Sequence, residues 1–137
     1  MYLIDTSVWI DSLRGIDNGP AHFFKALIAD GVPYGITGVI YQEVLQGARS
    51  RTDYDRLRTY LGSLSFYHPQ DPVGTYAEAA DLYRQCRDQG ITVRSTLDCL
   101  IARIAAEHHL ALVHNDRDFT NIASVYPELH IASCETH

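Results

Sequence analysis

The first thirteen residues, Met1-Tyr-Leu-Ile-Asp-Thr-Ser-Val-Trp-Ile-Asp-Ser-Leu13, contain the pattern that decides the fold. Tyr2–Ile4 is a short apolar run of the kind that forms a buried strand, and residues 7–13 follow as a helix. Asp5 lies between them, where the strand ends. A strand that passes through a polar turn into a helix is the beginning of a parallel α/β arrangement.

The rest of the chain repeats this alternation of strands and helices. Further strands are expected at 34–37, 65–68, 111–113 and 129–131. Helices are expected at 19–30, at 72–89 and around 97–104. One more helix begins after an N-cap at Thr37, and another runs to about Ser63. The helix that ends near Ser63 is either continuous with its predecessor or broken near Ser50. Five strands with helices between them predict a single α/β domain over residues 1–137.

Composition narrows the class of protein. With 46% hydrophobic and 20% charged residues, the chain is typical of a soluble globular protein. It shows neither an apolar run long enough to cross a bilayer nor a signal peptide pattern, so no membrane association is expected. The three cysteines, Cys86, Cys99 and Cys134, are odd in number and widely spaced. They indicate free thiols in a reducing compartment, and we expect a cytoplasmic protein.

The charge balance constrains the partners. The formal net charge is −6, whereas proteins that bind nucleic acid by general electrostatics are usually basic. Either the substrate is not a polyanion, or the acidity is concentrated where metal cations neutralise it. Arginine outnumbers lysine by ten to one, Lys25 being the single lysine. Genome composition explains this bias more simply than a preference for phosphate contacts.

Acidic residues fall at the expected strand ends and helix starts. Asp5 follows the first strand, Asp116 and Asp118 follow the strand at 111–113, Asp98 lies in the first turn of its helix, and Glu43 lies in the helix after the second strand. The carboxyl ends of parallel strands share one edge of the sheet, and ligands bind in the crevice there. We therefore expect these acids to meet at one rim.

Clustered carboxylates repel one another unless a cation neutralises them. A set of oxygen ligands matches Mg²⁺, with Mn²⁺ as an alternative. Such an ion can activate a water and stabilise the charge that develops when a phosphodiester is cleaved. It would also allow an acidic protein to bind RNA, because the metal supplies local positive charge.

Each acid also has a purely structural interpretation. Asp5 could cap the following helix. Asp98 could complete a capping box that begins at Ser95. Glu43 could be a solvated helix residue, and Asp116 and Asp118 could form a polar turn. Helix capping alone does not explain why all five follow the same pattern of strand ends and helix starts.

Four motifs resemble the PIN-domain family and, within it, the VapC toxins of toxin–antitoxin pairs. They are Ile-Asp-Thr-Ser-Val-Trp-Ile at 4–10, Ile-Tyr-Gln-Glu-Val-Leu-Gln-Gly at 40–47, Thr-Leu-Asp-Cys-Leu-Ile-Ala at 96–102 and Asn-Asp-Arg-Asp-Phe at 115–119. The motifs occur in the family's order and cover essentially the whole chain.

The resemblance implies a PIN-like domain in which a five-stranded parallel sheet is flanked by helices on both faces. It implies a magnesium-dependent endoribonuclease that acts on structured RNA such as tRNA or rRNA, dimerises, and is held inactive by a VapB-type antitoxin. The candidate catalytic residues carried over are Asp5, Glu43, Asp98 and Asp116. Of these, Asp5, Asp98 and Asp116 are expected to bind the metal, and Glu43 to orient or deprotonate the attacking water.

Other residues are expected to support this site. Thr6 matches a supporting hydroxyl, and Asp118 matches a second acid whose role differs among relatives. Weaker candidates for contacts with the RNA backbone are Arg49, Arg51, Arg94 and Arg117.

Three other functions could place acids at strand ends. A phosphatase of the haloacid dehalogenase type would need an acid at position 7, where Ser7 stands. A receiver-like signalling domain would need a lysine after the last strand. The single lysine, Lys25, lies in the helix expected at 19–30. A catalytically silent PIN-like module that binds RNA is distinguished only by an assay.

Overall fold

The computed structural model describes residues 1–134; residues 135–137, which the expected domain included, lie outside the described part. Its elements are β1 (Tyr2–Ile4), α1 (Thr6–Leu13), α2 (Gly19–Ala29), β2 (Tyr34–Ile36), α3 (Gly38–Gln46), α4 (Arg51–Gly62), β3 (Ser65–Phe66), α5 (Gly74–Asp88), α6 (Thr96–Glu107), β4 (Ala111–Val113), α7 (Arg117–Val125) and β5 (His130–Ile131). No helix among residues 1–134 combines the length and the apolar character needed to cross a membrane.

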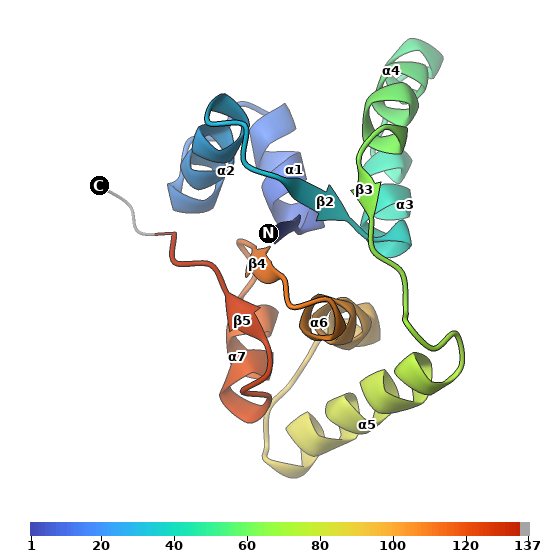
Figure 1. Cartoon of the computed structure of the whole chain (residues 1–137), viewed down its shortest axis with the longest axis vertical. Coiled ribbons are helices and arrows are strands. Elements are labelled where there is room, and N and C mark those ends of the chain that lie inside the picture. The colour runs from blue at the N-terminus through green and yellow to red at the C-terminus, as the bar shows by residue number, and fades with distance from the viewer. Residues whose placement is uncertain (135–137) are drawn as a thin grey trace.

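The strands form one five-stranded sheet in the order β3-β2-β1-β4-β5, and all neighbouring pairs are parallel (Figure 1). The first strand is central: Leu3 is in register with Gly35 of β2 on one side and with Leu112 of β4 on the other. This confirms the predicted five-stranded parallel sheet.

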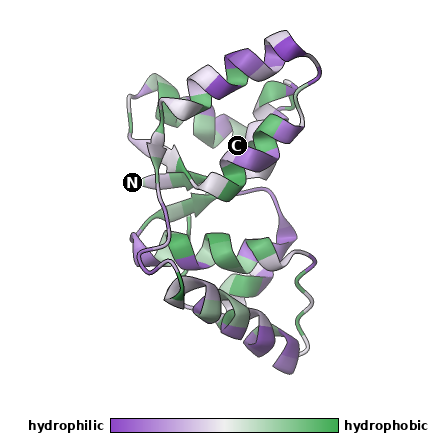
Figure 2. Cartoon of the chain, turned by 90° about the vertical axis from the view of Figure 1, so that its right-hand side faces the viewer, coloured by the Kyte–Doolittle hydropathy of each residue, from purple (hydrophilic) through white to green (hydrophobic). Residues whose placement is uncertain are grey.

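Helices cover both faces of the sheet, as predicted. The helices α1 to α4 pack against one another as one group, and α5 to α7 pack as another. Right-handed crossovers explain the division, since the chain moves in one direction from β1 to β3 and in the opposite direction from β4 to β5. Figure 2 shows the two groups on opposite sides of the strands.

The core lies between the sheet and these two layers. Leu3, Ile4, Leu112 and Val113 are fully buried, because the central strands are covered on both faces. The amphipathic helix predicted around residues 97–104 is α6, and most of its apolar residues are buried. Leu97 is an exception that remains 43% exposed, since it lies in the first turn.

Some expected boundaries differ from the structure. The helix at 117–125 (α7) was not predicted, because Asp116 and Asp118 suggested a polar turn; they are its N-cap and part of its first turn. The chain does break at Ser50, whose side chain caps α4 through Asp53 N–H. The second strand ends at Ile36, one residue earlier than expected, and Thr37 caps α3 as predicted.

The pairing of β2 with β3 depends on Gly35. A Cβ atom there would lie 2.5 Å from the backbone oxygen of Ser65 and 2.6 Å from the ring of Tyr67. We expect Gly35→Ala to lower the free energy of unfolding by about 1–3 kcal/mol, because a backbone oxygen cannot move without breaking the strand pair. Urea denaturation tests this, with Gly38→Ala as the matched control, since a Cβ at Gly38 meets no atom within 4 Å. Equal stability of the two variants would contradict the prediction.

Candidate metal centre

The carboxyl edge of the sheet brings the ends of β1 and β4 together. Hydrogen bonding between these strands continues past β1, where Asp5 N–H donates to Val113 O at 3.0 Å. The chain leaves β1 for α1 on one face and leaves β4 for α7 on the other face (Figure 1). A reversal of direction between neighbouring strands is the place where α/β proteins bind ligands.

Helices place two more acids at the same edge. Since α6 leads into the parallel strand β4, it must begin at the carboxyl edge, and Asp98 lies in its first turn. Glu43 lies in α3, which starts at that edge directly after β2. Burial raises the pKa of Asp98, and the carboxylates of Asp116, Asp5, Asp118 and Glu43 add to the rise, as acids in its neighbourhood do.

Asp5 is almost completely buried, with 4% of its surface exposed. Its Oδ2 accepts hydrogen bonds from Ser7 N–H at 3.0 Å and Ser7 Oγ at 2.7 Å, and so caps α1. Burial nevertheless raises the pKa of Asp5 above its usual range, and Glu43 adds to the effect. The capping and metal-binding interpretations are therefore compatible: the cap holds the carboxylate in place at the site.

The tightest group of acids consists of Asp98, Asp116 and Asp118. One carboxylate oxygen of each lies within 4.8 Å of the others. Asp5, which was expected beside Asp98 and Asp116, falls outside this group of three. Burial, reinforced by the neighbouring carboxylates, raises the pKa of Asp98 to about 7. A set of close carboxylate oxygens fits a hard divalent cation such as Mg²⁺ or Mn²⁺.

The capping-box interpretation of Asp98 finds no support in its contacts. The N-cap bond of α6 comes from Ser95 Oγ, which accepts from Leu97 N–H at 3.3 Å. Within residues 1–134, the Asp98 carboxylate accepts no hydrogen bond from Ser95 N–H, which a capping box requires.

Three of the acids lie at helix N-termini. Asp5 is the N-cap of α1, Asp98 lies in the first turn of α6, and Asp116 is the N-cap of α7. The partial positive charge at each N-terminus offsets some of the repulsion between the carboxylates. This arrangement favours negative charge on Asp5, Asp98 and Asp116.

Thr6 and Glu43 are joined directly, although they lie 37 residues apart. The Thr6 hydroxyl donates to Glu43 Oε1 at 2.8 Å, between the first turn of α1 and the middle of α3. Thr6 thus has a supporting contact of the kind expected from the sequence, and it fixes the orientation of Glu43.

The predicted arginines divide into two pairs. Arg94 contacts Asp116 and Asp118, and it lines a shallow pocket with Thr92, Arg117 and Asp118. Arg49 and Arg51 lie instead at the junction of α3 and α4, beyond the end of α3. There Arg49 N–H bonds to Asp53 and Arg51 pairs with Asp55. The structure therefore brings Arg94 and Arg117 to the acids but not Arg49 and Arg51.

Sequence reasoning missed the polar links that join the β1 and β4 loops. Ser7 Oγ accepts from Asn115 N–H at 2.9 Å, and Asn115 Nδ2 donates to Asp11 Oδ2 at 2.9 Å. These bonds tie the loop that carries Asp116 to α1. The two-residue spacing of Asp5 and Ser7 signals the cap, but no local pattern signals the bonds to Asn115.

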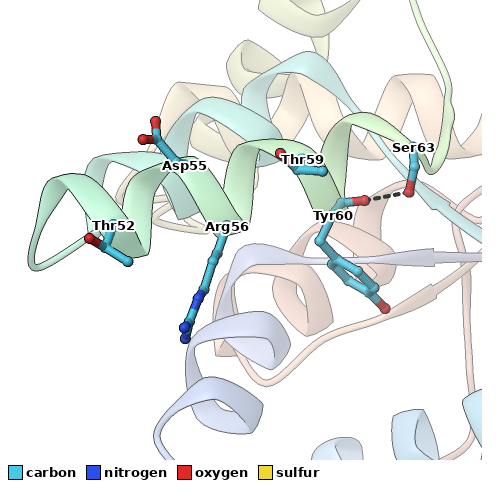
Figure 3. Close-up of a pocket in the computed structure, with 6 residues that line it drawn as sticks. All are labelled: Thr52, Asp55, Arg56, Thr59, Tyr60 and Ser63. Carbon is cyan, nitrogen blue, oxygen red and sulfur yellow. Dashed lines mark hydrogen bonds between the residues drawn. The ribbon is translucent and has the colours of Figure 1, made fainter.

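A larger open pocket of about 710 Å³ lies elsewhere, along α4. It is lined by Thr52, Asp55, Arg56, Thr59, Tyr60 and Ser63. Figure 3 shows Arg56 and Tyr60 extending to the same side of the helix. All six residues come from α4 and its C-cap, so this is an open surface with no convergent acids. We assign the chemistry to the sheet edge instead.

Comparison with known proteins agrees with this architecture. Residues 2–125 match the PIN domain family. VapC ribonuclease Mb1587 of Mycobacterium bovis and ribonuclease VapC11 of Mycobacterium tuberculosis are each 33% identical over 126 residues, covering 91% of this chain and 93% of each relative. The crystal structure of VapBC2 from Rickettsia felis, bound to a DNA fragment from its promoter, superposes with a TM-score of 0.69 at 18% identity, covering 96% of both chains. This chain belongs to the PIN-domain family, and its relatives place it in the VapC branch of that family.

Proposed function

We propose that this protein is a magnesium-dependent endoribonuclease that acts as the toxin of a type II toxin–antitoxin pair. The observation that carries the proposal is the convergence of five carboxylates from separate segments at one edge of the sheet. The relatives that cover most of the chain are named as ribonucleases. The proposed substrates are structured RNAs, such as tRNA or rRNA.

The proposed metal ligands are Asp5, Asp98 and Asp116, with Mg²⁺ as the ion and Mn²⁺ as a substitute. When bound, the ion supplies an activated water and stabilises the negative charge that develops on the phosphate. The protein itself positions the acids at three helix N-termini. Asp118 is assigned a supporting role, because both of its oxygens accept hydrogen bonds from Arg94.

Glu43 is the candidate general base. Its Oε1 is held by the Thr6 hydroxyl, so we assign Oε2 to orient a water and accept its proton. Arg94 and Arg117, which line the pocket beside Asp118, are placed to contact the RNA backbone. These two guanidinium groups would give local attraction for phosphates in a chain whose net charge is −6.

Thr6→Val is expected to lower kcat about tenfold with little change in KM, because it frees Glu43 while keeping the shape of the side chain. Single-turnover cleavage across a pH series measures this. Thr6→Ser keeps the hydroxyl and should restore the rate. A role confined to packing predicts the reverse, with Val tolerated and an unchanged pH profile.

The proposed partners are a VapB-type antitoxin and a second copy of the chain, and the proposed location is the cytoplasm. The R. felis structure is a VapBC complex, which supports an antitoxin partner. Light scattering after gel filtration tests the homodimer. Co-expression of a cognate VapB is expected to relieve the growth arrest that the toxin causes.

The decisive experiment is inducible expression in bacteria with mapping of new RNA 5′ ends, together with incubation of the purified protein with bulk RNA. We expect growth arrest, few mapped sites, and cleavage in Mg²⁺ that EDTA abolishes. Binding of RNA without cleavage in any divalent metal would overturn the proposal and support a silent RNA-binding module.

A further inference from the structure

Arg94 makes an unusual set of contacts for an exposed side chain. Its guanidinium donates from NH2 to Asp116 Oδ1 at 3.1 Å and from Nε to both oxygens of Asp118 at 3.3 Å. The side chain is 71% exposed, whereas that of Asp118 is only 6% exposed. Arg94 therefore reaches from the surface to two of the three acids in the tightest group.

These contacts engage two carboxylates of the group that fits a divalent ion. Asp116 Oδ1 already accepts two hydrogen bonds, from Arg94 NH2 and from Asp118 N–H at 2.9 Å. The guanidinium of Arg94 carries a permanent positive charge, as arginine does in proteins. A divalent ion is attracted less strongly to these carboxylates, because the guanidinium already neutralises part of their charge. The guanidinium also repels the ion directly.

We propose that Arg94 is an internal counter-cation of the acidic cluster, which competes with the divalent ion and thereby sets the metal concentration at which the site fills. Among the described residues, Arg94 is the one arginine that pairs with any of the five acids, and it pairs with Asp116 and Asp118. The guanidinium stabilises the cluster and the ion displaces it in part. The inference rests on the proposed function for the identity of the ion.

The guanidinium can be tested apart from the loop that carries it. Arg94 N–H donates to Asp118 Oδ2 at 3.1 Å, and any residue except proline keeps this bond. The preceding residue, Val93, is 5% exposed and anchors the loop in the core. Changing the Arg94 side chain should therefore remove the charge without releasing the start of α6.

The test compares Arg94→Gln and Arg94→Lys with the wild-type protein. The matched control is Arg87→Gln, at an exposed arginine in the last turn of α5. Mn²⁺ affinity is measured by isothermal titration calorimetry, and thermal unfolding is followed in EDTA and in saturating Mn²⁺. We expect Arg94→Gln to bind Mn²⁺ about tenfold more tightly and to melt at a lower temperature in EDTA. Arg94→Lys should fall between, and Arg87→Gln should match wild type.

Unchanged or weaker Mn²⁺ binding by Arg94→Gln would overturn the inference, even if its melting temperature falls, because a loop anchor affects stability alone. RNA cleavage by the wild-type protein is scored separately. If the wild-type protein cleaves RNA in an EDTA-sensitive reaction but Arg94→Gln does not change the Mn²⁺ affinity, only the inference about Arg94 is refuted. Tighter binding without any cleavage refutes the ribonuclease proposal and leaves the counter-cation role standing.

Discussion

Asp5→Asn is expected to lower the rate of magnesium-dependent RNA cleavage on the order of a thousandfold, which corresponds to about 4 kcal/mol of transition-state stabilisation. The substitution removes one negative charge from the buried floor of the site, where the carboxylate is 4% exposed. Asparagine caps helices as well as aspartate does, so the bond to Ser7 N–H and the start of α1 should survive. The loss should therefore appear in activity and metal affinity, with the fold intact.

The measurement is single-turnover cleavage of one mapped RNA in Mg²⁺, with circular dichroism to verify folding. Asp30→Asn is the matched control, because Asp30 is exposed and precedes β2, at the opposite edge of the sheet. A folded Asp5→Asn protein that retains wild-type activity would show that Asp5 serves only as a helix cap.

Asp98→Asn is expected to abolish cleavage and at the same time to stabilise the metal-free protein. The pKa of Asp98 is about 7 in the folded protein because of burial and the neighbouring acids, against about 3.9 in an unfolded chain. At a pH between these two pKa values, Asp98 is protonated in the folded protein and ionised in the unfolded chain. The free energy of unfolding therefore falls as pH rises from about 4 to about 7, and the full penalty applies above that.

Asp98→Asn removes this loss of stability, because the asparagine side chain is uncharged at every pH. At pH 8 in EDTA we expect Asp98→Asn to be more stable than wild type by on the order of 2–4 kcal/mol, or roughly 5–10 °C in melting temperature. At pH 4 the two proteins should melt together. In saturating Mg²⁺ the melting temperature of wild type should rise relative to that of Asp98→Asn, because the ion stabilises only the protein that binds it.

Thermal unfolding at pH 4, 6 and 8, with and without Mg²⁺, measures these differences. Asp30→Asn again controls for the loss of a negative charge. A lower melting temperature for Asp98→Asn at pH 8 would favour the capping role of Asp98, and a difference independent of pH would contradict the raised pKa.

Much of the fold was predictable because it is encoded by local patterns. Apolar runs of strand length, the cap at Thr37 and the spacing of apolar residues in α6 act over a few residues. The helix α7 was missed because its N-cap, Asp116, and the acid in its first turn, Asp118, also fit a polar turn. Which state forms depends on Phe119 and Ile122, whose burial under the sheet is a tertiary effect.

The candidate site shows the same division. The placement of Asp5, Asp98 and Asp116 at strand ends and helix starts follows from the order of elements along the chain. The bond from Thr6 to Glu43 and the contacts of Arg94 with Asp116 and Asp118 join residues 22 to 37 positions apart. No local pattern separates Arg94, which reaches the acids, from Arg51, which pairs with its helical neighbour Asp55.

The amino-acid sequence by itself determined that this is an α/β chain with its acids at one edge of a parallel sheet, because strand and helix periodicity act locally. Only the tertiary structure decided which oxygens accept hydrogen bonds, which acids have raised pKa values and which arginine contacts the acids. Those properties depend on burial and on distances of a few ångströms between segments, and the packing of the two helical layers fixes them.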